Sequence, residues 1–221
     1  MLNSIFPNAC ENCGELFFFK TQNYFCDKCL SLIKHQKTFY CRSCGDGVTN
    51  CQRCLSNRFF KDIQVYTKYS PPISKIIHEL KFNKVKTMSK IISNIIADDF
   101  KRFIKTKNIT KVIYIPQSKK LEKSRGYNHL KEILVELVPE FMIFEGIKKI
   151  KETRMQMNLS KEERETNLIG AFDIEENADF KNQNVLIFDD VLTTGSTIRE
   201  IFKLIKDRHI NNIYGYIITK S

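Results

Sequence analysis

The fold follows from one run of residues, Val185-Leu186-Ile187-Phe188-Asp189-Asp190-Val191-Leu192-Thr193-Thr194-Gly195-Ser196-Thr197. Its first part, residues 185–188, is apolar throughout and has the length of a strand that is buried on both faces. Strands of this kind occur in parallel sheets that are covered by helices. Ligands of such sheets bind at the carboxyl ends of the strands, so we expect a binding site in the residues after Phe188.

The residues after this strand carry the groups that a sugar phosphate needs. Asp189 and Asp190 offer carboxylate oxygens to adjacent sugar hydroxyls. Residues 193–197 combine hydroxyl donors with a glycine and precede a helix expected over residues 198–206, whose first amides favour an anion. The pattern therefore predicts a site for a ribose 5-phosphate. The alternative is an ordinary turn with a threonine-rich helix cap.

Composition divides the chain of 221 residues into two unequal parts. Every cysteine lies within residues 1–60, whereas residues 61–221 alternate apolar strands with amphipathic helices. We expect a small domain over the first part and, over the second, an α/β domain with a parallel sheet and flanking helices. No apolar run is long enough to span a bilayer and no secretory signal is present, which predicts a cytoplasmic protein without membrane insertion.

The formal net charge of +11 is unevenly distributed. Basic residues are concentrated after the expected domain boundary: Lys81, Lys84, Lys86, Lys90, Lys101, Arg102, Lys105, Lys107 and Lys111, followed by Lys119, Lys120, Lys123 and Arg125. Such a concentration favours a partner with many phosphates, and nucleic acid is the natural one. The alternative is that these lysines only cover solvated helix faces.

The small domain contains four C-x-x-C pairs, which are Cys10/Cys13, Cys26/Cys29, Cys41/Cys44 and Cys51/Cys54. Two pairs complete one closed shell of four thiolates, so the four pairs predict two structural zinc ions. We expect sequential pairing, in which the first two pairs share one ion and the last two share the other; interleaved pairing stays open. A disulfide framework or an iron–sulfur cluster would also use cysteines, but a cytosolic setting and the cysteine spacing disfavour both.

Two further segments complete the candidate ligand site. Gln117, Ser118, Lys119 and Arg125 follow a short strand expected over residues 112–115, where cationic groups are well placed to meet a second group of phosphates. A solvated surface turn is the alternative there. Residues 148–172 are polar and charged, which fits either a mobile flap over the ligand or a plain exposed helix.

The run around Asp189 and Asp190 resembles the phosphoribosyl pyrophosphate (PRPP) signature of type I phosphoribosyltransferases, with no departure. The resemblance implies that the two acids contact the ribose hydroxyls and that Thr193, Thr194, Gly195, Ser196 and Thr197 hold the 5-phosphate. With the double zinc ribbon and the run Arg125-Gly126-Tyr127-Asn128, nearly the whole chain resembles the ComF (ComFC) family of natural competence. Lys149 and Lys151 depart from it, because many relatives have arginines there.

In this family setting, the expected chemistry is displacement of pyrophosphate from PRPP by a nitrogen nucleophile. Mg²⁺ would bridge sugar hydroxyls and pyrophosphate oxygens. Lys119 and Arg125 would stabilise the departing pyrophosphate, and Lys81 also reaches toward it. No segment shows a pocket for the acceptor, so whether transfer takes place stays open.

Three functions are consistent with these residues. The one we favour is a PRPP-binding protein of natural competence that handles incoming single-stranded DNA, with the basic residues and aromatics such as Phe59, Phe60, Tyr66 and Tyr69 as contacts, unless those aromatics belong to the core. The second is an active phosphoribosyltransferase with an unidentified acceptor. The third is a zinc-ribbon adaptor that recruits a helicase or recombination partner.

Overall fold

The structure is a computed structural model that describes residues 8–17, 24–36, 60–83, 86–151, 153, 163 and 167–221. Its helices are α1 (Asp27–Leu30), α2 (Ile73–Phe82), α3 (Thr87–Thr106), α4 (Lys119–Arg125), α5 (His129–Leu134), the 3₁₀ turn η2 (Glu140–Met142) and α7 (Ser196–Ile205). Its strands are β1 (Asn8–Ala9), β2 (Leu16–Phe17), β3 (Asp62–Lys68), β4 (Lys111–Tyr114), β5 (Ile143–Phe144), β6 (Ile147–Lys149), β7 (Phe172–Ile174), β8 (Asn184–Leu192) and β9 (Asn212–Lys220).

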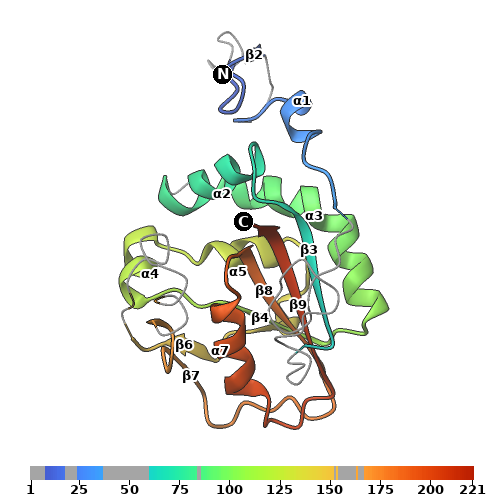
Figure 1. The fold of residues 1–221 in the computed structure, drawn as a ribbon, viewed down its shortest axis with the longest axis vertical. Helices are drawn as coiled ribbons and strands as arrows, with labels where there is room; N and C mark the ends of the chain where they lie inside the picture. The colour runs from blue at the N-terminus through green and yellow to red at the C-terminus, as the bar shows by residue number, and fades with distance from the viewer. Residues whose placement is uncertain are drawn as a thin grey trace.

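A parallel sheet forms the centre of the molecule, as the sequence predicts. Its strand order is β3-β9-β8-β4-β5, and every neighbouring pair is parallel. The apolar run of residues 185–188 lies in β8, the middle strand, and the two aspartates follow in the same strand. Helices cover the sheet on both faces, so the predicted α/β class is confirmed (Figure 1).

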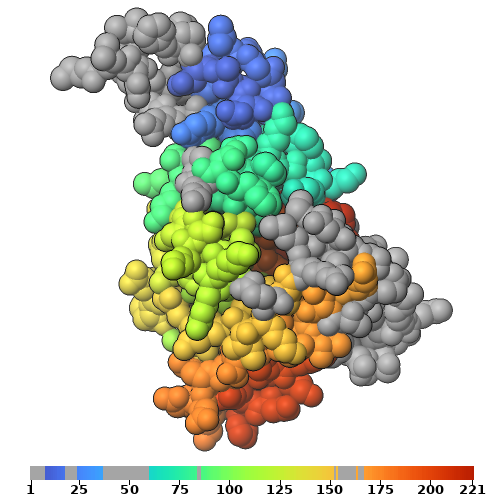
Figure 2. All heavy atoms as spheres, turned by 90° about the vertical axis from the view of Figure 1, so that its left-hand side faces the viewer, coloured from blue at the N-terminus to red at the C-terminus, as the bar shows by residue number. Residues whose placement is uncertain are grey.

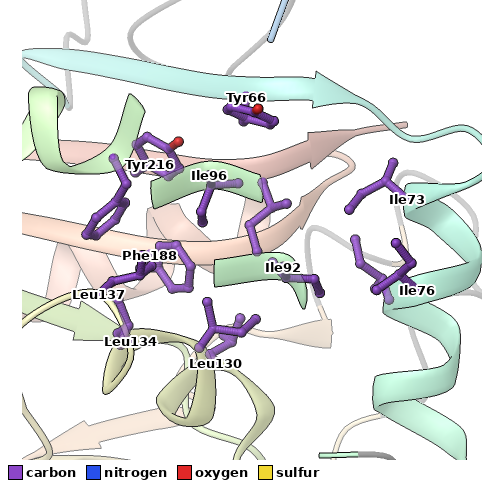
Figure 3. Close-up of a cluster of buried hydrophobic side chains, with 14 of the residues drawn as sticks. Tyr66, Ile73, Ile76, Ile92, Ile96, Leu130, Leu134, Leu137, Phe188 and Tyr216 are labelled. Atoms are coloured by element: carbon purple, nitrogen blue, oxygen red, sulfur yellow. The ribbon is translucent and has the colours of Figure 1, made fainter. Parts of the chain in front are cut away.

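Alternate residues of β8 point into two separate cores. Leu186 and Phe188 belong to the core that α2, α3 and α5 cover, and Figure 3 shows Phe188 beside Tyr216 among side chains of these helices. Val185 and Ile187 belong to the second core, on the side of α7. Burial on both faces therefore fixes the position of the carboxyl end of β8, where Asp189 and Asp190 lie.

The cysteine module contacts the sheet domain through its linker and through α2. The Gln36 amide donates to the Tyr66 carbonyl (2.9 Å), and the His35 ring stacks on the Tyr66 ring. Lys75 Nζ in α2 donates to the carbonyl oxygens of Glu11 (2.9 Å) and Asn12 (3.3 Å). Figure 1 accordingly shows the module beside α2 and α3. The domain boundary near residue 60 stays a prediction.

The structure decides one alternative that the sequence left open and moves one helix boundary. Phe60 and Tyr66, considered as stacking platforms for bases, are 2% and 8% exposed and pack in the cores, whereas Tyr69 is 37% exposed and Phe59 lies outside the described residues. Helix α7 begins at Ser196, two residues before the expected start, because Gly195 turns the chain immediately ahead of it.

Residues 148–172 include the end of β6 and the start of β7, which pair as a small antiparallel sheet. Most of the intervening residues lie outside the described part of the chain, so the flap and the exposed helix both stay predictions. Among the described residues, no helix combines the length and the apolar character that crossing a membrane requires.

Candidate functional site

The carboxylate of Asp190 is the centre of the site. It is 4% exposed, and its Oδ2 atom lies 2.5 Å from Lys81 Nζ and 2.9 Å from His129 Nε2. The Thr219 hydroxyl donates to the backbone carbonyl of Asp190 at 2.8 Å. The side chains of α2 and α5 and a neighbouring strand thus converge on one residue of β8.

The pKa values of the two adjacent aspartates are shifted in opposite directions. Burial favours a neutral acid at Asp190, but the charge of Lys81 and the ring of His129 outweigh it and hold the pKa of Asp190 well below its ordinary value. Desolvation, together with the negative charge of Asp190, raises the pKa of Asp189 well above its ordinary value. Asp190 is therefore the fixed charge, and Asp189 is the carboxyl whose ionisation a bound cation would favour.

His129 is a buried, neutral ring within this network. Burial lowers the pKa of His129 despite the nearby charge of Asp190, and the charges of Lys81 and Arg125 lower it further. A neutral imidazole has one N–H donor and one acceptor nitrogen. Its Nε2 lies 2.9 Å from Asp190, and its Nδ1 lies 2.5 Å from Gln117 Nε2.

The turn between β8 and α7 has the geometry of an anion site. Gly195 adopts a left-handed conformation with φ 73°, which favours glycine, and α7 begins directly after it. The hydroxyls of Thr194 and Ser196 lie 2.6 Å apart, and the Ser196 amide donates to the Thr194 hydroxyl at 3.4 Å. Hydroxyls and the first amides of a helix are therefore gathered in one place.

The loop after β4 adds the cationic residues. Ser118 is the N-cap of α4, and its hydroxyl accepts from the Leu121 amide at 3.4 Å. Arg125 donates to Gln117 Oε1 at 3.1 Å, and its guanidinium lies 5.7 Å from the centre of the Phe82 ring. Lys119 is exposed at the start of α4. Lys81, Gln117, Arg125 and Asp190 are thus connected directly or through His129.

Sequence reasoning missed His129 and Phe82. His129 directly follows the run Arg125-Gly126-Tyr127-Asn128 and begins α5, for which Asn128 is the N-cap. A histidine next to a functional motif was the available signal. Phe82 follows Lys81, is 43% exposed, and lies between His78, with ring centres 4.7 Å apart, and Arg125. Nothing in the spacing of Phe82 distinguished it from a core aromatic.

The first predicted cysteine set forms a compact cluster. The sulfur atoms of Cys10, Cys13, Cys26 and Cys29 all lie within 4.8 Å of one another, and none of the four forms a disulfide. Despite burial, hydrogen bonds from backbone amides lower the pKa of Cys10 to about 6. Four cysteine sulfur atoms in this arrangement fit a structural zinc ion with sequential pairing.

The second predicted cysteine set falls on residues that the structure does not describe. Its four members are Cys41, Cys44, Cys51 and Cys54, and all of them lie outside the described residues. The second zinc ion and its ligands therefore stay predictions from the C-x-x-C spacing.

Comparison with known proteins supports the resemblance. No family model matches the chain. Competence protein F of Haemophilus influenzae is 29% identical over an alignment that covers 100% of both chains. The resemblance to the ComF family is confirmed. The DNA utilization protein YhgH of Escherichia coli K12 is 27% identical over 81% of this chain and 83% of its own.

Among solved structures, a hypoxanthine phosphoribosyltransferase from Staphylococcus aureus covers 60% of this chain and 65% of its own, with 16% identity and a TM-score of 0.37.

The neutral state of His129 predicts a pH dependence of stability. Because its folded pKa lies below the ordinary 6.5, the unfolded chain takes up the proton first as the pH falls. The contribution of neutral His129 is therefore complete above about pH 6.5 and is lost progressively below it. Urea unfolding should show that the free energy of unfolding falls less between neutral and mildly acidic pH in His129→Gln than in the unmodified chain, because glutamine does not titrate. Equal losses for both proteins would contradict a neutral buried ring.

The cysteine assignment predicts a zinc stoichiometry. The whole chain should bind two zinc ions, and replacement of all four of Cys10, Cys13, Cys26 and Cys29 by serine should leave one, because sequential pairing leaves the second set intact. Zinc released on thiol modification, measured with a chromogenic chelator, gives the count. Lys75→Met is the control and should retain two. Loss of both ions in the fourfold variant would indicate interleaved pairing.

Proposed function

We propose that this chain binds PRPP with Mg²⁺ at the carboxyl end of β8 and acts in natural competence, where it handles single-stranded DNA in the cytoplasm. The observation that carries the proposal is the placement of Asp189 and Asp190 immediately before a left-handed Gly195 and the start of α7. Carboxylates for sugar hydroxyls and amides for a phosphate follow one another on a single strand, turn and helix. This is the arrangement that a ribose 5-phosphate requires.

Each side of the site has a role in this proposal. Asp189 and Asp190 accept hydrogen bonds from the ribose hydroxyls, while residues 193–197 hold the 5-phosphate. Arg125 and Lys119 face the pyrophosphate, for which charge-assisted hydrogen bonds are the strongest available. Asp189 and Asp190 would help to hold Mg²⁺, whose preference for oxygen ligands their carboxylates fit, and the ion would supply positive charge to the bound phosphates. The same residues would stabilise pyrophosphate as a leaving group if a nitrogen acceptor is present.

The DNA contribution to the proposal is supported by the relatives and by one face of the molecule. The two relatives are named for competence and for DNA utilization. Figure 2 shows α4, in yellow-green, next to α2 and α3 on one face. This face carries three exposed lysines of α4 and the exposed ring of Phe82, which we call the α2–α4 surface: Lys119, Lys120, Lys123 and Phe82. Exposed lysines and an exposed aromatic ring suit a single strand, because the cations can contact its phosphates and the ring can stack on its bases.

This assignment refines the basic region expected from sequence. Lys107, expected to be a phosphate contact, forms an ion pair with Asp62 at 2.8 Å. Lys81 is paired with Asp190, and Lys84 lies outside the described residues. The exposed lysines of α4 are therefore better candidates for DNA contacts than the paired ones.

PRPP binding is tested by removing the carboxylate charges. Asp189→Asn and Asp190→Asn should each weaken PRPP binding in the presence of Mg²⁺ by about tenfold or more, because each change removes a charged hydrogen-bond acceptor. Isothermal titration calorimetry measures the affinity. Asp207→Asn, at a side chain that is 86% exposed, is the control and should bind normally. Unchanged affinity in the first two variants would show that PRPP does not bind at the end of β8.

DNA binding is tested by charge reversal on the α2–α4 surface. Lys119→Glu, Lys120→Glu and Lys123→Glu together should abolish single-strand binding, and the affinity of the unmodified chain should fall steeply with salt as counterions are released. Lys181→Glu, Lys203→Glu and Lys206→Glu make the same change in charge at other exposed positions and serve as the matched control. Fluorescence anisotropy of a labelled single-stranded oligonucleotide measures the affinity of each variant and the salt dependence of the unmodified chain. Equal effects of the two triple variants would indicate non-specific attraction alone.

A further inference from the structure

We propose that His129 and Gln117 are positioning residues that tie the carboxylate of Asp190 to the guanidinium of Arg125, so that the sugar-binding and phosphate-binding sides of the site respond as one unit. This inference rests on the proposed function and deepens it, because it names the residues that would regulate ligand binding at the same site.

A continuous chain of hydrogen bonds carries the proposal. Arg125 lies 3.1 Å from Gln117 Oε1, Gln117 Nε2 lies 2.5 Å from His129 Nδ1, and His129 Nε2 lies 2.9 Å from Asp190 Oδ2. His129 and Asp190 are 5% and 4% exposed, so water competes little for the inner bond. The residues come from α4, the loop after β4, α5 and β8, so the bonds connect four separate elements.

The chemistry of the two ends fixes the direction of every bond between them. A guanidinium only donates hydrogen bonds and an ionised carboxylate only accepts them. Gln117 must therefore accept from Arg125 through Oε1 and donate through Nε2 to His129 Nδ1. His129 Nδ1 is then the acceptor nitrogen, and the single ring proton is on Nε2, directed at Asp190. The hydrogen bond from Arg125 to Gln117 thus determines which ring nitrogen of His129 carries the proton, and so whether Asp190 has a hydrogen-bond donor at Nε2.

The chain makes the two sides of the site dependent on one another. If a phosphate draws Arg125 away from Gln117, the amide of Gln117 loses the partner that holds it in one orientation. A reversed amide would present its oxygen to Nδ1 and favour the ring proton there, which removes the donor that Asp190 now has. Lys81 shares the same carboxylate oxygen and would remain its charged partner in this network. Binding at Arg125 therefore alters the hydrogen bonding of Asp190.

Two substitutions at His129 separate the two bonds of the ring. In His129→Gln the amide lies near the position of Nε2, so it can still donate to Asp190 but no longer contacts Gln117. In His129→Asn the amide lies near the position of Nδ1, so it can contact Gln117 but does not reach Asp190. If His129 had a purely structural role, the PRPP affinity of each variant would fall in proportion to its loss of stability. A positioning role predicts rescue of PRPP affinity by Gln and about a tenfold or greater loss with Asn.

The link to Arg125 is tested with a double-mutant cycle. The effect of Arg125→Met on PRPP affinity should differ between the unmodified chain and His129→Gln, where the connection is already broken. Calorimetry on the four zinc-loaded proteins gives the affinities, and thermal unfolding shows that each is folded. Additive effects of the two substitutions would overturn the proposal, and so would equal affinities of the Gln and Asn variants. If His129→Asn does not fold, the cycle with His129→Gln still decides.

A ligand-free measurement separates this inference from the proposed function. ¹⁵N spectra of the His129 ring in the unmodified chain should show the proton on Nε2 at neutral pH, and Arg125→Met should shift part of the ring population to the other tautomer, because Gln117 loses the partner that orients its amide. A proton on Nδ1, or a ring unaffected by Arg125→Met, would overturn the relay. If Arg125→Met shifts the ring but the unmodified chain does not bind PRPP, the proposed function alone is overturned.

Discussion

The site depends on the burial of one ionised carboxylate. An unpaired charge as buried as Asp190 would destabilise the fold, so it requires partners that approach from several directions. Lys81 of α2 supplies the counter-charge, and His129 of α5 supplies a directed hydrogen bond. The Thr219 hydroxyl of β9 holds the backbone next to them. The fold and the site are therefore stabilised by the same contacts, and helices distant in sequence are brought together at the end of β8.

Helix α2 connects this carboxylate with the cysteine module. Near its start, the Lys75 ammonium contacts the carbonyl oxygens of Glu11 and Asn12, in the turn between the first two cysteines. At its end, Lys81 contacts Asp190, and the Leu80 carbonyl accepts from the Tyr127 hydroxyl at 3.1 Å. The turn that a metal ion would order and the carboxylate of the site thus contact opposite ends of one short helix. Ordering of the cysteine cluster stabilises the helix that carries the counter-charge.

The sequence predicted the elements of the site better than their connections. The apolar run ending at Phe188 was enough to place a central parallel strand, because burial on both faces leaves a clear pattern. The residue types around Asp190 and in the first cysteine set predict a sugar-phosphate site and a zinc site, and the structure brings the Asp190 contacts and the four cysteines together. His129 was not predicted, since its partner Asp190 is distant in sequence and no periodicity reports such a contact. Phe60 and Tyr66 were ambiguous for the same reason, because composition does not show which aromatic rings face a core.

The order of strands in the sheet has a consequence for synthesis of the protein. Strand β9 lies between β3 and β8, so in the described sheet β3 pairs with a strand formed by residues 212–220. A ribosome releases β3 long before β9, and parallel pairing at such sequence separation is slow. During that interval the edge of β3 has no strand to pair with. The cysteine module, which precedes β3 in the chain, has no completed sheet domain to pack against. Zinc binding by the first cysteine set needs no such distant strand, so this part of the module can fold before the sheet is complete.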